Sequence, residues 1–425
     1  MAISKRSKPS KQQREPVVEK EILVDARTDV KRVALLENGR LMEIYYDDPK
    51  HARLVGNIYK GIVSDVLSGI SAGFVNVGED ENLFLPTKEL SAGFLKDKNL
   101  RRADNIPIGK VLKAGQQLII QVKREGIGEK NPQGTTRISL AGRYWVFLPQ
   151  DERLGVSRRI EEFKESRRLK EIGRELKRDG EGLIARTAAQ SASQEDLERD
   201  FKFLLGTWKG ILDKASKATA PKLIYQGQGV VKSIARDRLM RDVTKVIVDS
   251  KKAFDELIEF LKYLHMEEYV KHVELYKGKK PLFEVRGVEE EIRLSMEPKI
   301  YLPGGGSIII AEMEALTAID VNTGSDTRHR NQELAILNTN LEAAVEIPRQ
   351  LRLRKISGII VVDFIDMKEI ANEDKLVECI KFELKKDRVP SDFIDITALG
   401  LIEITRKREG ESLQDMLSED NEDED

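Results

Sequence analysis

A continuous apolar run near the end of the chain constrains the fold more than any other feature. Residues 358–367 read GIIVVDFIDM, in which four apolar side chains precede Asp363. Such a run is typical of a central strand that is buried on both faces of a sheet. We therefore expect a sheet covered by helices, with Asp363 at the point where the strand leaves the core.

An alternating segment stands before this run and is separated from it by one amphipathic helix. Residues 314–324 read EALTAIDVNTG, and because side chains alternate along a strand, Asp320 and Asn322 lie on the same face. Residues 333–354 carry apolar side chains at helical spacing. Two strands joined through one helix can lie side by side in one sheet. The pattern then brings Asp320 and Asp363 together at neighbouring strand ends.

Two carboxylates and an amide, with no histidine or cysteine nearby, make a site with oxygen ligands only. Such a site suits Mg²⁺, with Mn²⁺ as an alternative, rather than zinc. A divalent ion held in this way keeps several water molecules, activates one of them and neutralises charge on a phosphodiester. Hydrolysis of a phosphodiester is the reaction that fits. An aspartate at a strand end is also a common cap or turn residue, so the pattern by itself leaves a structural role open.

The first half of the chain is rich in short strands with glycine between them. Residues 21–46 contain strands broken at Asn38-Gly39, which is a strong hairpin signal. About five more strands follow over residues 55–123, and their spacing favours a small barrel over a doubly wound sheet. Charged and apolar periodicities predict helices over residues 157–178 and 193–217.

Composition limits the class of protein. Of the 425 residues, 40% are hydrophobic and 34% charged, as in a soluble globular protein with several compact units. No run of 18 apolar residues exists, so no membrane span is expected. One cysteine, Cys379, excludes an internal disulfide and a cysteine-rich zinc site within one chain, and it indicates a reducing cytoplasm. The basic residues 1–17 and the acidic residues 416–425 are typical of disordered tails, so the net charge of −1 does not exclude a local RNA site.

Several segments resemble the ribonuclease E/G family, in the same order along the chain. EALTAIDVNTG, residues 338–367 and ALGLIEITRKR at 398–408 are similar to the catalytic signature of the family. VGNIYKG, FVNVGEDENLFLP, SRRIEE and GLIARTAA resemble its upstream blocks. The resemblance extends over about residues 18–415 and is closer to the ribonuclease G branch.

The resemblance implies a multi-subdomain fold of mixed α+β and α/β class. An S1-type OB-fold barrel at 55–135 is inserted into a ribonuclease H-like subdomain, which combines residues 18–54 with 232–295. A 5′-sensor region at 136–231 and a DNase I-like catalytic subdomain at 296–415 complete the expected organisation.

The resemblance also implies a Mg²⁺-dependent endoribonuclease that cuts single-stranded RNA, with mRNA and rRNA precursors as substrates in RNA processing and mRNA decay. Asp320 and Asp363 match the metal-binding aspartates of the family, and Asn322 matches its supporting asparagine. The family shares a zinc ion between subunits through a Cys-x-x-Cys motif, which this sequence lacks. No structural zinc is therefore expected, and a zinc-linked tetramer is in doubt, whereas other homo-oligomers remain open.

Further residues match RNA-contacting positions of the family. Phe74 and Phe84 correspond to its RNA-stacking phenylalanines, whereas without the resemblance both would be expected to fill the barrel. Arg186 and Thr187 match the pocket that binds a 5′-monophosphate, where an arginine and a hydroxyl group make charge-assisted hydrogen bonds. Thr135 is expected to close the other side of that pocket.

Three basic residues complete the candidates for RNA binding. Lys130 lies in a polar loop and aligns with a lysine that contacts RNA in the family. Arg352 and Arg354 could contact backbone phosphates near the cut site, and ion pairs within the protein are an equally good interpretation of both.

Two other functions remain open at this point. A non-cleaving RNA-binding protein of the same ancestry would keep the phenylalanines and Arg186 without needing the aspartates. A phosphodiesterase that acts on DNA would need the metal site, and aromatic faces stack on unpaired bases of either nucleic acid. A cleavage assay separates all three functions.

Overall fold

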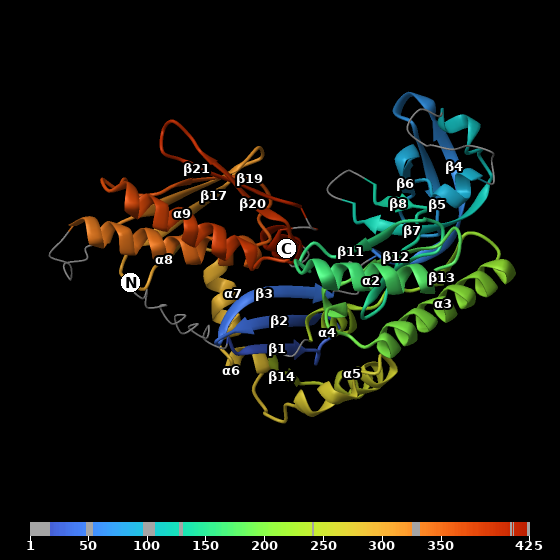
Figure 1. Ribbon diagram of the computed structural model, residues 1–425, viewed down its shortest axis with the longest axis horizontal. Helices are drawn as coiled ribbons and strands as arrows, with labels where there is room; N and C mark the ends of the chain where they lie inside the picture. Colours follow the sequence, from blue (N-terminus) through green and yellow to red (C-terminus); the bar gives the residue numbers. More distant parts are fainter. Residues whose placement is uncertain are drawn as a thin grey trace, which may run out of the picture.

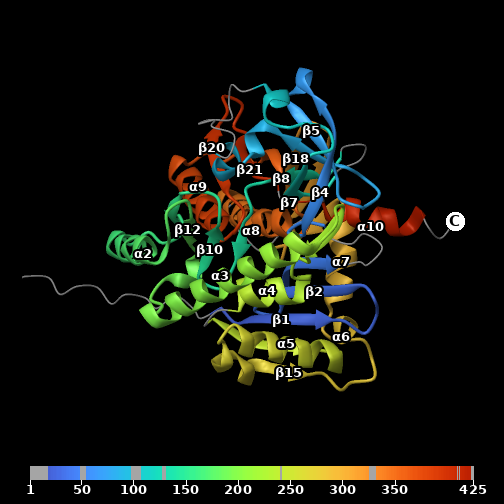
Figure 2. The ribbon, with the colours of Figure 1, turned by 90° about the vertical axis from the view of Figure 1, so that its right-hand side faces the viewer.

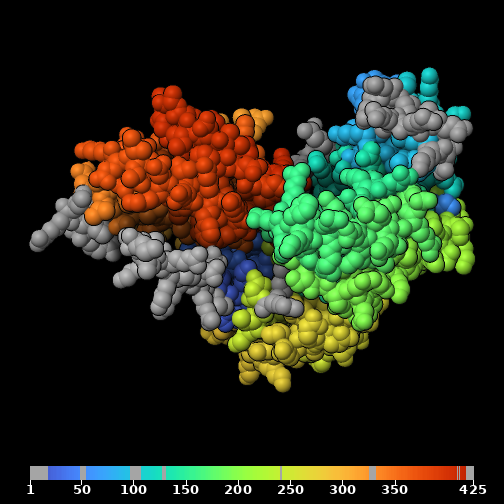
Figure 3. Space-filling model, in the orientation of Figure 1, coloured from blue at the N-terminus to red at the C-terminus, as the bar shows by residue number. Residues whose placement is uncertain are grey.

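The computed structural model describes residues 18–47, 54–96, 107–126, 131–239, 242–324, 332–408, 410 and 412–422. Within them the strands form four sheets (Figure 1). In the space-filling view, the C-terminal part forms one lobe, and the barrel with the neighbouring helices forms another (Figure 3). The part that contains both the N-terminal strands and residues around 250–290 lies below and between these lobes.

The first sheet joins two distant segments of the chain. Its five strands have the order β15-β14-β1-β2-β3, in which β1 pairs in parallel with β14 and antiparallel with β2. Asn38 and Gly39 have φ values of 51° and 78° and form the hairpin turn that the sequence predicted. The strands are β1 Lys20–Asp25, β2 Lys31–Glu37, β3 Arg40–Asp47, β14 Val243–Val248 and β15 Val273–Leu275.

Helices cover both faces of the first sheet (Figure 2). Since successive side chains of β1 point to opposite sides of the sheet, this strand contributes to a core on each face. Ile22 and Val24 pack with α4 and α5 in one core. Leu23 packs in a second core with α6 and α7, and this core also includes Leu353 and Leu413 from the C-terminal part. The second core therefore fastens the C-terminal part to the first sheet. The helices are α4 Val230–Arg238, α5 Lys251–Tyr263, η5 Glu267–His272, α6 Leu282–Val285 and α7 Val288–Met296.

A closed barrel of five strands follows β3 along the chain. Its strand order is β4-β5-β6-β8-β7, and a pairing between β4 and β7 closes it. The predicted small barrel is thereby confirmed, and it is consistent with an OB-like fold. The strands are β4 Ile58–Leu67, β5 Ala72–Asn76, β6 Leu83–Pro86, β7 Gln117–Arg124 and β8 Gln133–Thr135, and β13 Lys222–Tyr225 extends the sheet beside β4. The short helices between them are η1 Ser68–Ile70, η2 Thr87–Glu89, α1 Ala92–Lys96 and η3 Ile108–Lys110.

A four-stranded sheet with two helices lies next to the barrel. Helix α3 spans Gln194–Lys217, and the hydroxyl of Ser193 caps it by accepting the N–H of Asp196, which confirms the predicted helix. Helix α2 (Phe163–Leu176) begins later than expected, because the N–H of Ser157 still pairs with the carbonyl oxygen of Ala185 and the N–H of Ile160 donates to Ser157 in a turn. The other elements are β9 Leu140–Ala141, β10 Trp145–Leu148, β11 Leu154–Val156, β12 Gly182–Ala185 and η4 Thr187–Ala189.

The C-terminal sheet has six strands in the order β16-β17-β18-β19-β21-β20. Helices α8 and α9 pack on one face, where Ile360 and Val362 are fully buried. The prediction that β19 is buried on both faces was wrong: Ile359 is 52% exposed and Asp363 is exposed. Most strand pairs here are antiparallel, and such sheets commonly leave one face open. The elements are β16 Lys299–Tyr301, β17 Ser307–Glu312, β18 Thr317–Asn322, α8 Gln332–Leu353, β19 Gly358–Asp363, α9 Ile370–Lys385, β20 Ser391–Ile396 and β21 Ile402–Arg406.

The end of the chain differs from the expected disordered acidic tail. Helix α10 spans Leu413–Glu422, with Leu413 buried and Met416 and Leu417 packed against the second core of the first sheet. These three apolar residues at helical spacing explain why the acidic segment is helical. Residues 1–17 and 423–425 lie outside the described residues. In the described part of the chain, no helix has both the length and the apolar character needed to cross a membrane.

Candidate active site

The candidate metal site lies on the open face of the C-terminal sheet. Strands β18 and β19 are parallel neighbours, and Asp320 stands directly opposite Asp363 in their register. Neighbouring strands are about 4.8 Å apart, so the two carboxylates leave the same face side by side. Asn322 lies on that face as well, and its Nδ2 donates to Oδ2 of Asp320 at 2.6 Å. The structure thus brings together the three residues that the sequence predicted for this site.

Among the described residues, no basic side chain balances the charge on Asp320 and Asp363. Both residues are exposed, and neither forms an ion pair with another described residue. Two carboxylates about 5 Å apart repel each other by roughly 1 kcal/mol in water, and by more where solvent is excluded. The described residues contain no group of three or more His, Cys, Asp or Glu that could hold a metal. A divalent ion at Asp320 and Asp363 would therefore keep water among its ligands, as Mg²⁺ commonly does.

Helix α8 fixes the chain just past Asp363. Asn340 on α8 is fully buried, and its Nδ2 donates to the carbonyl oxygen of Ile365 at 2.8 Å. Its Oδ1 accepts the N–H of the same residue at 3.1 Å. At the start of α8, Glu333 accepts the N–H of Lys368 at 3.0 Å. Buried polar groups that are fully hydrogen-bonded specify one conformation, so these contacts determine where β19 ends.

A second pair of aspartates stands at the ends of β1 and β14, which are also parallel neighbours. Burial and the nearby charge of Asp25 raise the pKa of Asp249 to about 6, although Asp249 accepts the N–H of Ala26. Arg32 donates to Asp25 at 2.9 Å, and Nε of Arg27 lies 3.4 Å from Oδ2 of Asp249. Here guanidinium groups supply the positive charge. The same strand-end pattern therefore makes an internal ion cluster in the first sheet and, as far as the described residues show, a carboxylate pair without a basic partner in the C-terminal sheet.

Phe74 and Phe84 are cross-strand partners on β5 and β6. Their ring centroids are 5.8 Å apart, both side chains are partly exposed, and neither belongs to the core cluster of the barrel. The interpretation that they fill the barrel is therefore wrong. Their position suits stacking on bases. Lys130 lies outside the described residues.

A basic cavity of about 400 Å³ lies between the first sheet, the four-stranded sheet and the ends of α8 and α9. Of the residues that the structure describes, nine Lys and Arg line it against five Asp and Glu, which is a formal excess of four positive charges. The basic residues are Lys20, Arg143, Arg159, Arg186, Arg236, Arg238, Arg352, Lys386 and Arg388, and the acidic residues are Glu21, Glu37, Glu43, Asp237 and Asp242. Such a cavity favours an anionic ligand.

Arg186 and Thr187 both line this cavity. The Arg186 guanidinium donates from Nη1 to the carbonyl oxygen of Gly142 and from Nη2 to Oδ1 of Asp237, each at 2.6 Å. Burial lowers the pKa of Arg186, and the charge of Asp237 opposes that effect. The hydroxyl groups of Thr187 and Ser157 share a hydrogen bond at 3.0 Å. The two residues that the resemblance assigned to a 5′-phosphate therefore lie together in a basic environment.

Thr135 does not belong to this cavity, so its predicted place there was wrong. It is buried in β8, where its hydroxyl donates to the carbonyl oxygen of Glu89 at 3.1 Å and accepts the N–H of Arg137 at 3.0 Å. Strand β8 lies between β6 and β7 in the barrel wall, where Gly134 faces Leu83 and Ile120 of the barrel core, so the neighbouring Thr135 side chain points to the opposite side of the strand.

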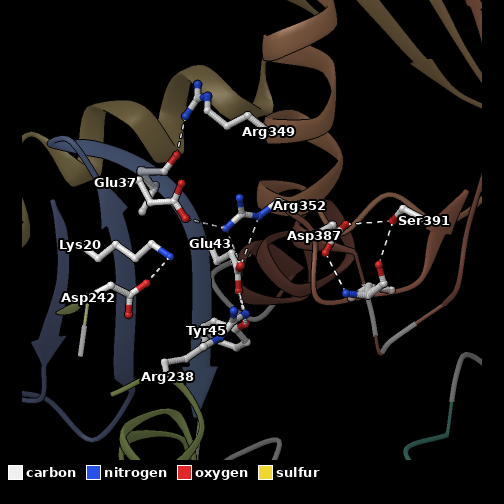
Figure 4. A network of polar contacts seen from close by, with 12 residues as sticks. Lys20, Glu37, Glu43, Tyr45, Arg238, Asp242, Arg349, Arg352, Asp387 and Ser391 are labelled. Atoms are coloured by element: carbon white, nitrogen blue, oxygen red, sulfur yellow. Dashed lines mark hydrogen bonds and ion pairs between the residues drawn. The ribbon is translucent and has the colours of Figure 1, made fainter. Parts of the chain in front are cut away.

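Arg352 and Arg354 form contacts within the protein. Arg352 is 7% exposed and pairs with Glu43 at 2.8 Å and with Glu37 at 3.3 Å (Figure 4). Arg354 is 6% exposed and donates from Nε to Gln350 at 2.8 Å. Direct contact with RNA phosphates near the cut site does not fit these positions. The alternative of internal ion pairs is correct for Arg352, whereas Arg354 donates to the Gln350 side chain and to the carbonyl oxygen of Glu297. Arg352 also lines the basic cavity.

The sequence analysis did not identify seven of the basic residues that line the cavity. They come from five separate segments, and their common position depends on the meeting of three units rather than on any motif. One of them, Arg159, lies in the block SRRIEE, which resembles the family, and this resemblance was the sequence feature that could have indicated it. The seven are Lys20, Arg143, Arg159, Arg236, Arg238, Lys386 and Arg388.

Comparison with known proteins identifies relatives along almost the whole chain. The model of the ribonuclease E/G family matches residues 139–409. Ribonuclease G of Haemophilus influenzae is 37% identical over 402 residues, which are 94% of this chain and 82% of that protein. Ribonuclease G of Escherichia coli K12 is 36% identical over 403 residues, covering 93% and 81%. Ribonuclease E of H. influenzae is 39% identical over 397 residues, covering 93% and 42%. The chain is closer to ribonuclease G, as the sequence predicted, and it belongs to the ribonuclease E/G family.

Proposed function

We propose that this chain is a metal-dependent endoribonuclease that hydrolyses phosphodiester bonds in single-stranded RNA. The observation that carries the proposal is the pair Asp320 and Asp363, which stand opposite each other on parallel strands and form no ion pair with the residues that the structure describes. Relatives named ribonuclease G and ribonuclease E support RNA as the substrate. RNA processing and mRNA decay are the processes in which such an enzyme would act.

Asp320 and Asp363 would hold Mg²⁺, or alternatively Mn²⁺, because carboxylate oxygens on an exposed face match the ligands of these ions. When bound there, the ion supplies an activated water molecule and neutralises charge on the phosphodiester. Asn322 fixes the orientation of the Asp320 carboxylate through its hydrogen bond. Since the other face of the sheet is packed on α8 and α9, an RNA strand must approach from the open side.

Two further sites would bind the substrate. Phe74 and Phe84 offer adjacent rings for stacking on unpaired bases. The basic cavity around Arg186 and Thr187 would bind a 5′-monophosphate, since buried guanidinium groups make strong bidentate contacts with phosphate oxygens. Together these sites would favour single-stranded RNA with a 5′-monophosphate.

Replacement of either aspartate tests the catalytic proposal. Asp320→Asn and Asp363→Asn should each reduce cleavage of a fluorescent single-stranded RNA by about 10³-fold, equivalent to about 4 kcal/mol, because each loses a charged metal ligand. Binding of the same RNA should remain within about twofold. Asp392→Asn is the matched control, since Asp392 is exposed on strand β20 of the same sheet.

The same assay distinguishes the alternatives. Full cleavage by both variants would remove the proposed mechanism. A wild-type chain that binds RNA but never cuts it in Mg²⁺ would be the non-cleaving protein, and equal cleavage of single-stranded DNA would favour a DNA phosphodiesterase.

Replacement of Arg186 tests the 5′-phosphate site. Arg186→Ala should erase any preference for 5′-monophosphorylated over 5′-hydroxyl RNA in the rate of cleavage, because the cavity loses its central donor. Arg167→Ala is the control, since Arg167 is 70% exposed on α2 and forms a surface ion pair with Glu171. An unchanged ratio between the two RNAs would place the sensor elsewhere.

A further inference from the structure

We infer that Asp237 is a built-in competitor for the terminal phosphate: it binds the Arg186 guanidinium in the free protein and must release it when a phosphate enters the cavity. The inference rests on the proposed 5′-phosphate site and deepens it, because it names the residue that sets the selectivity of that site.

The contacts of Arg186 show what a phosphate would meet. Both terminal nitrogens already donate, Nη1 to Gly142 and Nη2 to Asp237, and the side chains of Arg186 and Asp237 are only 15% and 20% exposed. A carboxylate and a phosphate use the same planar donors of a guanidinium. Asp237 therefore occupies a position in which it repels any second anion that approaches Arg186.

A second arginine makes release of Arg186 feasible. Arg236 holds Asp237 through two contacts, Nε to Oδ1 at 2.6 Å and Nη2 to Oδ2 at 3.2 Å. Burial would raise the pKa of Asp237, but the hydrogen bonds and charges of Arg236 and Arg186 outweigh it and lower the pKa to about 2. Asp237 is thus charged at neutral pH. When Arg186 turns to a phosphate, Arg236 still balances this carboxylate, so no buried charge is left unpaired.

The other residues of the cavity favour an RNA end that carries a doubly charged phosphate over one that carries a neutral 5′-hydroxyl. Arg143 donates to the backbone carbonyls of Arg236 and Leu239, and Arg159 donates to a backbone carbonyl as well. Within the described part of the chain, neither forms an ion pair with a carboxylate. Arg388 also faces the cavity, and among the described residues it has no hydrogen bond or ion pair. A terminal phosphate carries about −1.5 to −2 charges near pH 7 and can outcompete one carboxylate, whereas a 5′-hydroxyl cannot.

The variant Asp237→Asn distinguishes two roles of Asp237: competition with the phosphate for Arg186, and support of Arg186 in phosphate binding. We expect the full-length variant to bind a 5′-monophosphorylated RNA decamer about fivefold more tightly than wild type in EDTA, which corresponds to about 1 kcal/mol. Binding of the 5′-hydroxyl decamer should change by less than about twofold. The control is Asp242→Asn, because Asp242 lines the same cavity but pairs with Lys20 at 2.7 Å and not with Arg186. Unchanged or weaker binding by Asp237→Asn, or an equal gain from Asp242→Asn, overturns the inference.

A structure of the wild-type protein provides a test that does not depend on a folded variant. With a 5′-phosphorylated dinucleotide bound, the Arg186–Asp237 ion pair should open while the Arg236–Asp237 contacts remain. A bound phosphate beside an intact Arg186–Asp237 pair would overturn the inference. Failure of the proposed function has a different result: wild type would then show no preference for the 5′-phosphate, and Arg186→Ala would change nothing.

Discussion

Replacement of Glu43 by glutamine should weaken the junction between the first sheet and the C-terminal part. Glu43 on β3 is 7% exposed and binds Arg352 of α8 at 2.8 Å. It also binds Arg238 at the end of α4 and accepts the hydroxyl of Tyr45 (Figure 4). Glutamine keeps the shape of the side chain but leaves two buried guanidinium groups without their shared counter-charge.

The magnitude follows from the charges around Glu43. Burial raises its pKa, but Arg238 and Arg352 outweigh burial and lower the pKa from 4.5 to about 2. That difference is equivalent to about 3 kcal/mol in favour of the charged form. Removal of one partner from a buried ion pair commonly costs about 3–5 kcal/mol, which agrees. We therefore expect Glu43→Gln to reduce the free energy of unfolding by about 3 kcal/mol at pH 7.

The effect has a defined dependence on pH. Because the pKa of Glu43 is lower in the folded protein than in the unfolded chain, its stabilisation is complete above the unfolded value of 4.5. It is lost as the pH falls toward the folded value of about 2. The difference in stability between wild type and Glu43→Gln should thus shrink steadily over this range.

Urea denaturation followed by circular dichroism measures the effect. The matched control is Glu37→Gln, because Glu37 binds the same Arg352 at 3.3 Å from a side chain that is 23% exposed. Such a partly solvated contact should contribute less than about 1 kcal/mol. A loss in Glu43→Gln below about 1 kcal/mol, or no larger than that of Glu37→Gln, would refute the reasoning about the buried network.

Three further predictions concern RNA binding, the catalytic strand and assembly. Phe74→Ala and Phe84→Ala should each weaken binding of single-stranded RNA by about 1–3 kcal/mol with little change in melting temperature, and unchanged affinity in a filter-binding assay would argue against stacking. Asn340→Leu removes both hydrogen bonds to Ile365, so it should reduce the free energy of unfolding by about 1–3 kcal/mol. It should also reduce cleavage more than RNA binding, and a normal rate of cleavage would show that these hydrogen bonds do not position Asp363. Since Cys379 is the single cysteine, chelation of zinc should not change the mass measured by light scattering, and a mass that falls on chelation would contradict this.

Much of the local structure was predictable from the sequence because it depends on neighbouring residues. The Asn38-Gly39 hairpin, the capped helix after Ser193 and the shared face of Asp320 and Asn322 each follow from a few consecutive positions. The resemblance to the family added which segments carry the site. The expectation of two-sided burial around Asp363 failed because an apolar strand does not specify how many faces its neighbours cover.

The tertiary structure decided which charges are balanced. Three strands of this chain end in the same way, as ILVD, VIVD and IIVVD, and the sequence alone does not distinguish their aspartates. In the folded protein, Arg27 and Arg32 reach Asp249 and Asp25, whereas Asp363 and its neighbour Asp320 receive no guanidinium from the described residues. The basic cavity also depends on this level of structure, since its lining comes from segments that are distant in the chain. Strand alternation acts over two residues and can be read from sequence, but electrostatic compensation depends on distances through space, which only packing fixes.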